Sequence, residues 1–102
     1  MDELVNLAKI FSDINRLKIL ALILRDKEVC VCEVCDTLEL SQPLVSRHLK
    51  QMKEANILQA QKNGKWVIYS LHKKPSSALK SWAYELKKYL HTLPTIVSCQ
   101  TK

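Results

Sequence analysis

The sequence is poor in the features that mark membrane, secreted and disordered proteins. It has one glycine and three prolines in 102 residues, and 47% of its residues are hydrophobic, a content that excludes a disordered chain. No apolar run is long enough to cross a bilayer, so we expect no membrane partner. Acidic residues follow Met1 in place of a charged and then apolar leader. We therefore predict a cytoplasmic protein with reduced thiols.

The sequence also lacks the arrangements on which common enzyme mechanisms depend. No nucleophile, base and oxyanion-binding group recur in a pattern typical of hydrolysis. Cys32 and Cys35 have the spacing of a dithiol oxidoreductase. That motif normally opens a helix after a strand in a thioredoxin-like fold, and no such strand is evident in the sequence. We predict that the protein is not an enzyme, with a dithiol oxidoreductase as the least favoured alternative.

Positive charge is the first informative feature that is present. Sixteen lysines and arginines against ten acidic residues give a net charge of +6. Such a balance favours an anionic partner, with nucleic acid as the first candidate, although charge alone also fits an inert basic surface. The length predicts one domain, residues 1–102. A domain of this size buries a modest share of its surface, which favours a partner subunit.

Two amphipathic segments at the chain ends flank a strongly apolar one. Apolar residues at helical spacing predict helices over 1–12 and 76–91. Residues 14–24 are apolar on nearly all sides and predict a buried central helix, capped by Ser12 or Asp13. With that helix buried, we predict that the end helices join two subunits in a homodimer; the alternative is that both cover the same core. The predicted interface residues are Leu4, Leu7, Phe11, Leu79, Trp82, Leu86 and Tyr89.

The middle of the chain has the pattern of a helix-turn-helix. In residues 30–55 a short helix and a tight turn lead into a second helix, which Ser41 is expected to cap and Pro43 to start. The second helix of this motif enters the major groove of DNA. There Gln42 can pair with adenine and Arg47 with guanine; the alternative is a solvated helix face. The predicted DNA-binding residues of this helix are Gln42, Ser46, Arg47, His48 and Lys50.

The same helix has a narrow apolar stripe that is predicted to face the core. The stripe consists of Val45, Leu49 and Met52. His48 lies near its edge, where it either contacts DNA or is a histidine with satisfied hydrogen bonds at the helix boundary. We favour the second interpretation for His48.

A β-hairpin is predicted over residues 57–71. Asn63-Gly64 is the favoured dipeptide of a two-residue type I′ turn, because both positions need positive φ. This turn would pair Lys62 with Lys65, at the tip of the hairpin. Both lysines are predicted to contact DNA phosphates, which position a protein without reading sequence; the alternative is that they only keep the hairpin soluble. The predicted apolar face consists of Leu58, Ala60, Val67 and Tyr69.

Three of the four cysteines, Cys30, Cys32 and Cys35, lie within six residues. Thiolates bind soft metals and metalloids. Helical spacing brings Cys32 and Cys35 to one face but puts Cys30 and Cys32 on nearly opposite faces. One atom can bind all three sulfurs only if Cys30 precedes the helix or the first turn is distorted, so a ligand would reshape the helix start. The alternative is three structural cysteines; Cys99 is not predicted as a ligand.

Residues 30–74 resemble the arsenic-responsive repressors of the ArsR/SmtB family, which are winged-helix metal sensors. Two departures are Ile14, where many relatives have proline, and Cys99, which has no counterpart in the basic pattern. The motifs that carry the resemblance are Cys30-Val-Cys32-Glu-Val-Cys35-Asp36, Leu40-Ser41-Gln42-Pro43, Ser46-Arg47-His48-Leu49 and Gly64-Lys65-Trp66-Val67-Ile68-Tyr69.

The resemblance implies a mainly α fold with a small β-hairpin: a homodimeric winged helix-turn-helix of five helices and a two-stranded wing. It implies a repressor that holds double-stranded operator DNA ahead of arsenic-resistance genes. Trivalent arsenic or antimony bound to Cys30, Cys32 and Cys35 would release it, with no cofactor required. A repressor that senses zinc, cadmium or thiol redox state stays an alternative. Glu85 and His91 lie on different helix faces, which disfavours the zinc site that other members carry on the last helix.

Overall fold

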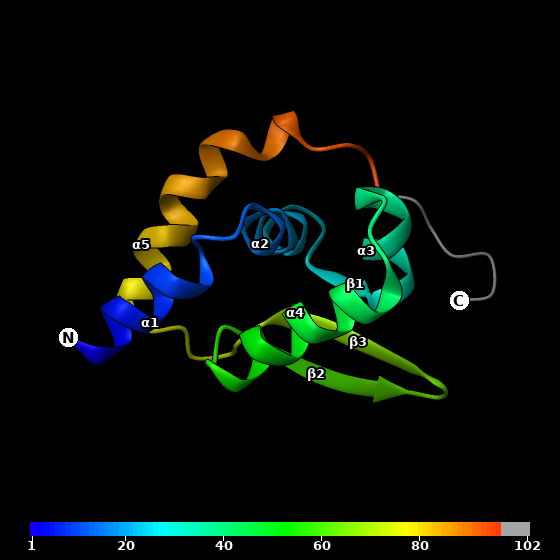
Figure 1. Ribbon diagram of the computed structural model, residues 1–102, viewed down its shortest axis with the longest axis horizontal. Helices are drawn as coiled ribbons and strands as arrows, with labels where there is room; N and C mark the ends of the chain where they lie inside the picture. Colours follow the sequence, from blue (N-terminus) through cyan, green and yellow to red (C-terminus); the bar gives the residue numbers. More distant parts are fainter. Residues whose placement is uncertain (97–102) are drawn as a thin grey trace.

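A buried helix, α2, lies at the centre of the molecule, and the other elements surround it (Figure 1). The computed structural model describes residues 1–96. The β2–β3 hairpin extends away from the helices, and α1 and α5 lie together on the opposite side (Figure 1). In chain order the elements are α1 (Asp2–Ile10), α2 (Ile14–Asp26), β1 (Glu28–Cys30), α3 (Val31–Leu38), α4 (Gln42–Glu54), β2 (Leu58–Asn63), β3 (Trp66–Leu71), α5 (Ser77–Leu86) and the 3-10 helix η1 (Lys87–Thr92).

The five predicted helices and the hairpin are confirmed, but the sheet has a third strand. β1 pairs antiparallel with β3, which gives the strand order β1-β3-β2. Val29 lies opposite Tyr69, and Cys30 lies opposite Ile68. The prediction of a two-stranded wing was therefore incomplete. A strand of three residues is too short for alternation of polar and apolar residues to reveal it.

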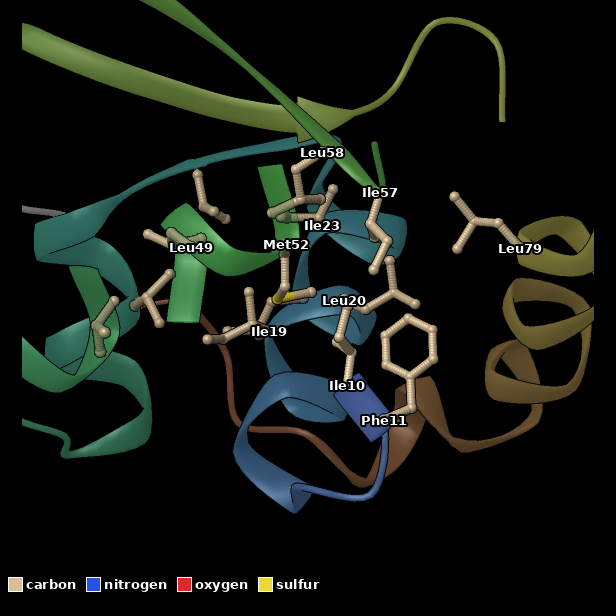
Figure 2. Packing of buried hydrophobic residues seen from close by; sticks show 14 of the residues in the cluster. Ile10, Phe11, Ile19, Leu20, Ile23, Leu49, Met52, Ile57, Leu58 and Leu79 are labelled. Carbon is tan, nitrogen blue, oxygen red and sulfur yellow. The ribbon is translucent and has the colours of Figure 1, made fainter. Parts of the chain in front are cut away.

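Helix α2 supplies the centre of the core, as predicted. The Asp13 carboxylate accepts a hydrogen bond from the N–H of Asn15 at 2.8 Å, so Asp13 is the N-cap. Burying each large apolar side chain contributes roughly 1.5–3 kcal/mol. Ile14, which the apolar pattern placed in the buried helix, is instead 63% exposed at its first position. Figure 2 shows side chains from several elements that converge here: Ile19, Leu20 and Ile23 of α2, Leu49 and Met52 of α4, Ile57 just before β2, and Leu58 at the start of β2.

A tilted aromatic pair connects the C-cap of α1, Phe11, with α5. The ring centroids of Phe11 and Trp82 are 4.9 Å apart at an interplanar angle of 49°. Ser76 caps α5 by accepting a hydrogen bond from the N–H of Leu79 at 3.1 Å. The predicted single helix over 76–91 is divided, because α5 ends at Leu86 and the chain continues as the tighter helix η1.

The predicted dimer-interface residues fall into two groups by exposure. Leu7, Phe11 and Leu79 are buried within the protomer, so they support the two helices from inside. Leu4 and Tyr89 are more than half exposed, and Trp82 and Leu86 are half-buried. Only the second group offers surface to another subunit, and the dimer itself stays a prediction.

The hairpin forms with a register two residues away from the predicted one. Lys62 lies opposite Val67 and Asn63 opposite Trp66, so the turn residues are Gly64 and Lys65. Gly64 has φ of +64° and no positive φ occurs at Lys65, which fits a turn with glycine at its first central position. The predicted pairing of Lys62 with Lys65 was wrong. A shift of two residues preserves the alternation, so the predicted apolar side chains still share one face.

Candidate DNA-binding and metalloid-sensing surface

The helix-turn-helix consists of α3, a tight turn and α4. Glu39 ends α3 in the left-handed conformation, with φ of 56°, and the N–H of Leu40 donates to the carbonyl of Cys35 at 3.0 Å. Pro43 lies in the first turn of α4, as predicted. Ser41 is the N-cap residue, but its hydroxyl makes no capping hydrogen bond within residues 1–96. The predicted capping role of that side chain was wrong.

Helix α4 has the two faces that a recognition helix needs. The predicted stripe of Val45, Leu49 and Met52 is completely buried, which fixes the helix on the core. The opposite face carries the polar side chains that were predicted to meet DNA. Gln42, Arg47 and Lys50 are exposed, and Ser46 is half-buried.

The structure contradicts the prediction of a DNA contact for His48. The residue is only 5% exposed, and its side chain faces α2. The favoured alternative, a histidine with satisfied hydrogen bonds, was also wrong, because neither ring nitrogen has a hydrogen-bond partner among the described residues. Its Nε2 lies 4.0 Å from Oδ2 of Asp13. Burial lowers the pKa of His48, an effect that Asp13 opposes and the charges of Arg16 and Arg47 reinforce.

The tip of the wing carries two exposed lysines. Lys62 lies near the end of β2, and Lys65 follows Gly64 in the turn. The ammonium of Lys65 lies 5.6 Å from the centroid of the Trp66 ring, a contact that holds this side chain beside its own strand. Both ammonium groups are thus placed on a projecting element (Figure 1), as contacts to a phosphate backbone require.

Cys30 precedes the helix, which is one of the two arrangements that the spacing of the cysteines allowed for a shared ligand. It is the last residue of β1 and the N-cap of α3, and its side chain is 1% exposed. Its N–H donates to Oε1 of the buried Glu33 at 3.1 Å, in a capping box that also involves the Cys30 side chain. Cys30 therefore holds the start of α3 and the edge of the sheet together.

Cys32 and Cys35 occupy the first and second turns of α3. The sulfur of Cys32 lies 3.6 Å from Oδ2 of Asp36. Burial raises the pKa of the Cys35 thiol, and the charges of Asp36 and Cys30 add to this effect. Within residues 1–96 no group of three histidine, cysteine or acidic side chains is already arranged to hold a metal ion. A ligand that bound all three sulfurs would therefore have to move at least one of them.

A cavity of about 520 Å³ joins the cysteines to the DNA-binding elements. Gln42 lines it from the first position of α4, and Lys65 and Trp66 line it from the wing. The side of the cavity formed by α3 includes Cys30, Cys32 and Cys35. The sequence placed the cysteines near the recognition helix along the chain, but it gave no signal that the wing would complete the same cavity.

Two alternative chemistries receive little support from the geometry. A strand does precede the Cys32–Cys35 motif, contrary to the sequence analysis, but it is a three-residue edge strand of an antiparallel sheet. Glu85 lies on α5 and is paired at 3.1 Å with Lys88 of η1, the element that also carries His91. Cys99 lies outside the described residues. No helix within residues 1–96 has the length and apolar character needed to span a membrane.

Comparison with known proteins places this arrangement in a family. Residues 13–60, which run from the cap of α2 into β2, match the family model described as "Bacterial regulatory protein, arsR family". The arsenical resistance operon repressor of Escherichia coli is 40% identical over 82 residues, which are 80% of this chain and 67% of that protein. The chain belongs to the ArsR family of bacterial regulatory proteins. The resemblance of residues 30–74 is thereby confirmed.

Two further comparisons agree with membership in the ArsR family. The arsenic resistance transcriptional regulator ArsR1 of Pseudomonas putida is 50% identical over 64 residues, which are 63% of this chain and only half of that protein. The structure of reduced HlyU from Vibrio cholerae has 31% identity and a TM-score of 0.74, covering 85% of this chain and 87% of that one. The winged helix-turn-helix fold is thus confirmed. These relatives are named as regulators or repressors and not as enzymes, in agreement with the sequence analysis.

Proposed function

We propose that this chain is a transcriptional repressor that binds operator DNA as a homodimer and is released by trivalent arsenic or antimony bound to Cys30, Cys32 and Cys35. The observation that carries this proposal is the cavity in which the three cysteines share walls with Gln42 and Lys65. Any ligand bound to these sulfurs acts beside the first residue of the recognition helix and beside the tip of the wing.

The DNA-binding step uses two different kinds of contact. In the proposed complex the exposed face of α4 lies in the major groove, where Gln42 and Arg47 contact base edges and Lys50 contacts the backbone. Lys62 and Lys65 bind phosphates on the flank of the site. The base contacts supply specificity, and the phosphate contacts supply affinity that depends on salt.

The release step is a ligand exchange at the three thiols. Cys32 is disulfide-bonded in the structure, so a thiol reductant must first cleave that disulfide and protonate its sulfur. Arsenous acid, As(OH)₃, then forms three arsenic–sulfur bonds, and each hydroxyl leaves as water with the proton of one thiol. We infer that Cys30 is the sulfur that moves from the end of β1 toward the arsenic, since it is 1% exposed whereas Cys32 and Cys35 are half-buried on α3. β1 is paired with β3, so this movement disturbs both the start of α3 and the base of the wing.

The dimer is proposed to form through the exposed surface of α1, α5 and η1. Large apolar side chains lie exposed on these elements at Leu4, Val5, Tyr84 and Tyr89. A second copy of the chain that covered them would remove this apolar area from water. Sedimentation of the Leu4→Lys variant tests this surface without disturbing the core, and a dimer that persists unchanged would place the interface elsewhere.

The decisive experiment is a release titration on a fluorescent duplex that the protein itself has selected from a random-sequence library. Arsenite, antimonite, zinc, cadmium and hydrogen peroxide are compared side by side on the reduced protein. We expect arsenite and antimonite to release the duplex at the lowest concentrations, because three local thiolates satisfy a pyramidal ion whereas zinc favours four ligands. Release by zinc, cadmium or peroxide alone would favour the alternative sensors, and failure to select any duplex would refute the repressor.

A further inference from the structure

A polar cluster lies between α2 and the recognition helix, on the side away from the cysteines. It consists of Asp13 and Arg16 on α2 and His48 and Gln51 on α4, and we call it the α2–α4 cluster. Arg16 Nη1 donates to Oε1 of Gln51 at 2.6 Å, which is a direct bond between the two helices. Oδ2 of Asp13 lies 4.0 Å both from Nη2 of Arg16 and from Nε2 of His48. One carboxylate oxygen is therefore shared between two cationic or potentially cationic groups.

The cluster contains buried nitrogen atoms whose hydrogen-bonding capacity is unused. Nδ1 and Nε2 of His48 and Nε of Arg16 are buried and have no hydrogen-bond partner within residues 1–96. Unpaired polar groups are costly in an interior and are a common sign of function. The stripe of α4 beside them is completely buried and apolar. An apolar residue at position 48 would therefore pack there without leaving unpaired nitrogen atoms.

The charges around His48 make its protonation consequential. Asp13 stays ionised, since the N–H of Asn15, His48 and Arg16 lower its pKa despite an opposing effect of burial. A proton on His48 would place a cation against Arg16 and Arg47, and would compete with Arg16 for the same oxygen of Asp13. Two further charged residues, Lys9 and Glu54, line a hollow of about 350 Å³ with Arg16 and Gln51.

We propose that the α2–α4 cluster is a proton-sensitive support of the recognition helix. Arg16, held by Asp13, positions α4 through Gln51, and a proton on His48 weakens this support and lowers the affinity for DNA. The inference goes beyond sensing by cysteines, although it rests on the proposed DNA binding. It assigns positioning roles to Asp13, Arg16 and His48, none of which faces DNA.

The first test concerns the bond between Arg16 and Gln51. Binding of the selected duplex is measured for Arg16→Ala, Gln51→Ala and the double variant in a double-mutant cycle. We expect each single variant to lose roughly twofold to tenfold in affinity for the duplex. The double variant should lose no more affinity than the weaker-binding single variant, because each substitution removes the same Arg16–Gln51 hydrogen bond. Lys18→Ala removes a different cation from α2 and is the matched control. Losses that multiply in the double variant would overturn the coupling.

The second test is the pH dependence of binding between about pH 5 and pH 8. The parent should lose affinity for the duplex as the pH falls, and His48→Gln should lose less affinity over the same range. His72→Gln and His91→Gln are the controls, because they replace the other two histidines of the sequence. Asp13→Asn keeps a good N-cap but removes the charge, so its loss should begin at a lower pH than that of the parent. Identical profiles for parent and His48→Gln would overturn the proton-sensitive support alone, and a parent that binds no duplex at any pH would overturn the repressor as well.

The same variants give a readout that does not require DNA. The pKa of His48 is lowered in the folded state, so below about pH 6.5 the unfolded chain binds more protons than the folded chain. Folding stability is therefore complete above this pH and declines as the pH falls. Urea unfolding of His48→Gln should show a smaller decline than the parent. An equal decline in both proteins would contradict the assignment of a buried, neutral His48.

Discussion

The two ends of the recognition helix are held in different ways. At its N-terminal end, Gln42 lines a cavity of about 520 Å³ together with the cysteines and the wing. Within residues 1–96 the Ser41 hydroxyl makes no capping hydrogen bond to the first turn of this helix. In its second half, Leu49 and Met52 are completely buried, and Gln51 is bonded to Arg16 of α2. A ligand at the cysteines can therefore act on the N-terminal end while the second half stays attached to the core.

In the proposed release step, this difference would allow the domain to leave DNA without unfolding. Base contacts come mainly from the N-terminal residues of a recognition helix, which is the end beside the cavity. A rotation of α4 about its buried half would move Gln42 more than it would move Gln51. The predictions below test whether the two ends have these separate roles, beginning with the largest expected effect.

Removing packing from the buried half should destabilise the whole domain. Leu49→Ala should cost roughly 2–5 kcal/mol in the free energy of unfolding, because Leu49 is completely buried in the core. Urea denaturation followed by circular dichroism measures this quantity. Lys53→Ala, on the exposed side of the same helix, is the control and should change stability by less than about 0.5 kcal/mol. A Leu49→Ala protein as stable as the parent would show that this half is not fixed by packing.

Removing a thiol at the other end should abolish the response and leave DNA binding intact. Cys32→Ser and Cys35→Ser should bind the selected duplex but show no release at saturating arsenite. Cys30→Ser keeps a residue that can cap α3 and should bind arsenite more weakly, with partial or no release. Cys99→Ser should behave like the parent.

Release titrations beside direct measurement of bound arsenic distinguish these outcomes. If Cys99→Ser alone lost the response, the sensor would lie beyond the described residues, and the comparison of the two helix ends would lose its basis.

Changing the exposed face of α4 should alter specificity. Arg47→Ala should reduce the discrimination between the selected duplex and random DNA by ~1–3 kcal/mol if the guanidinium makes a bidentate base contact. Competition binding with both duplexes measures this difference. Lys53→Ala again serves as a control, since it removes a charge from the same helix without removing a predicted base contact. Unchanged discrimination in Arg47→Ala would mean that α4 is oriented differently on DNA.

The smallest effect is expected at the wing. Lys62→Ala and Lys65→Ala should weaken binding to the selected duplex and to random DNA by similar factors. Each should reduce the slope of log affinity against log salt concentration by about 1. Binding over a series of salt concentrations gives this slope. Lys27→Ala removes an exposed lysine at the end of α2, near the base of the hairpin and not at its tip, and should leave the slope unchanged. A change in specificity at the wing would show that it reads bases as well as phosphates.

Local patterns in the sequence determined most of the secondary structure. The pattern of apolar residues located α1, α2, α4 and α5, because the neighbours of a helical residue are three and four positions away. The short helix α3 was predicted from the helix-turn-helix pattern instead. The caps at Asp13 and Ser76 agree with the residue types at these positions. The cysteine spacing left two ways for one atom to bind all three sulfurs, and the structure has the first of them, with Cys30 before α3. These features depend on nearby residues, and a single sequence contains that information.

Tertiary structure decided the features that depend on distant segments. β1 exists because Glu28–Cys30 meets β3, some forty positions further along the chain. His48 is polar and one position from the exposed Arg47, yet it is buried, because α2 covers that side of α4. The wing and the cysteines share a cavity because the sheet joins them. Strand pairing and burial depend on which distant element packs against a residue. Local periodicity contains no information about that distant element.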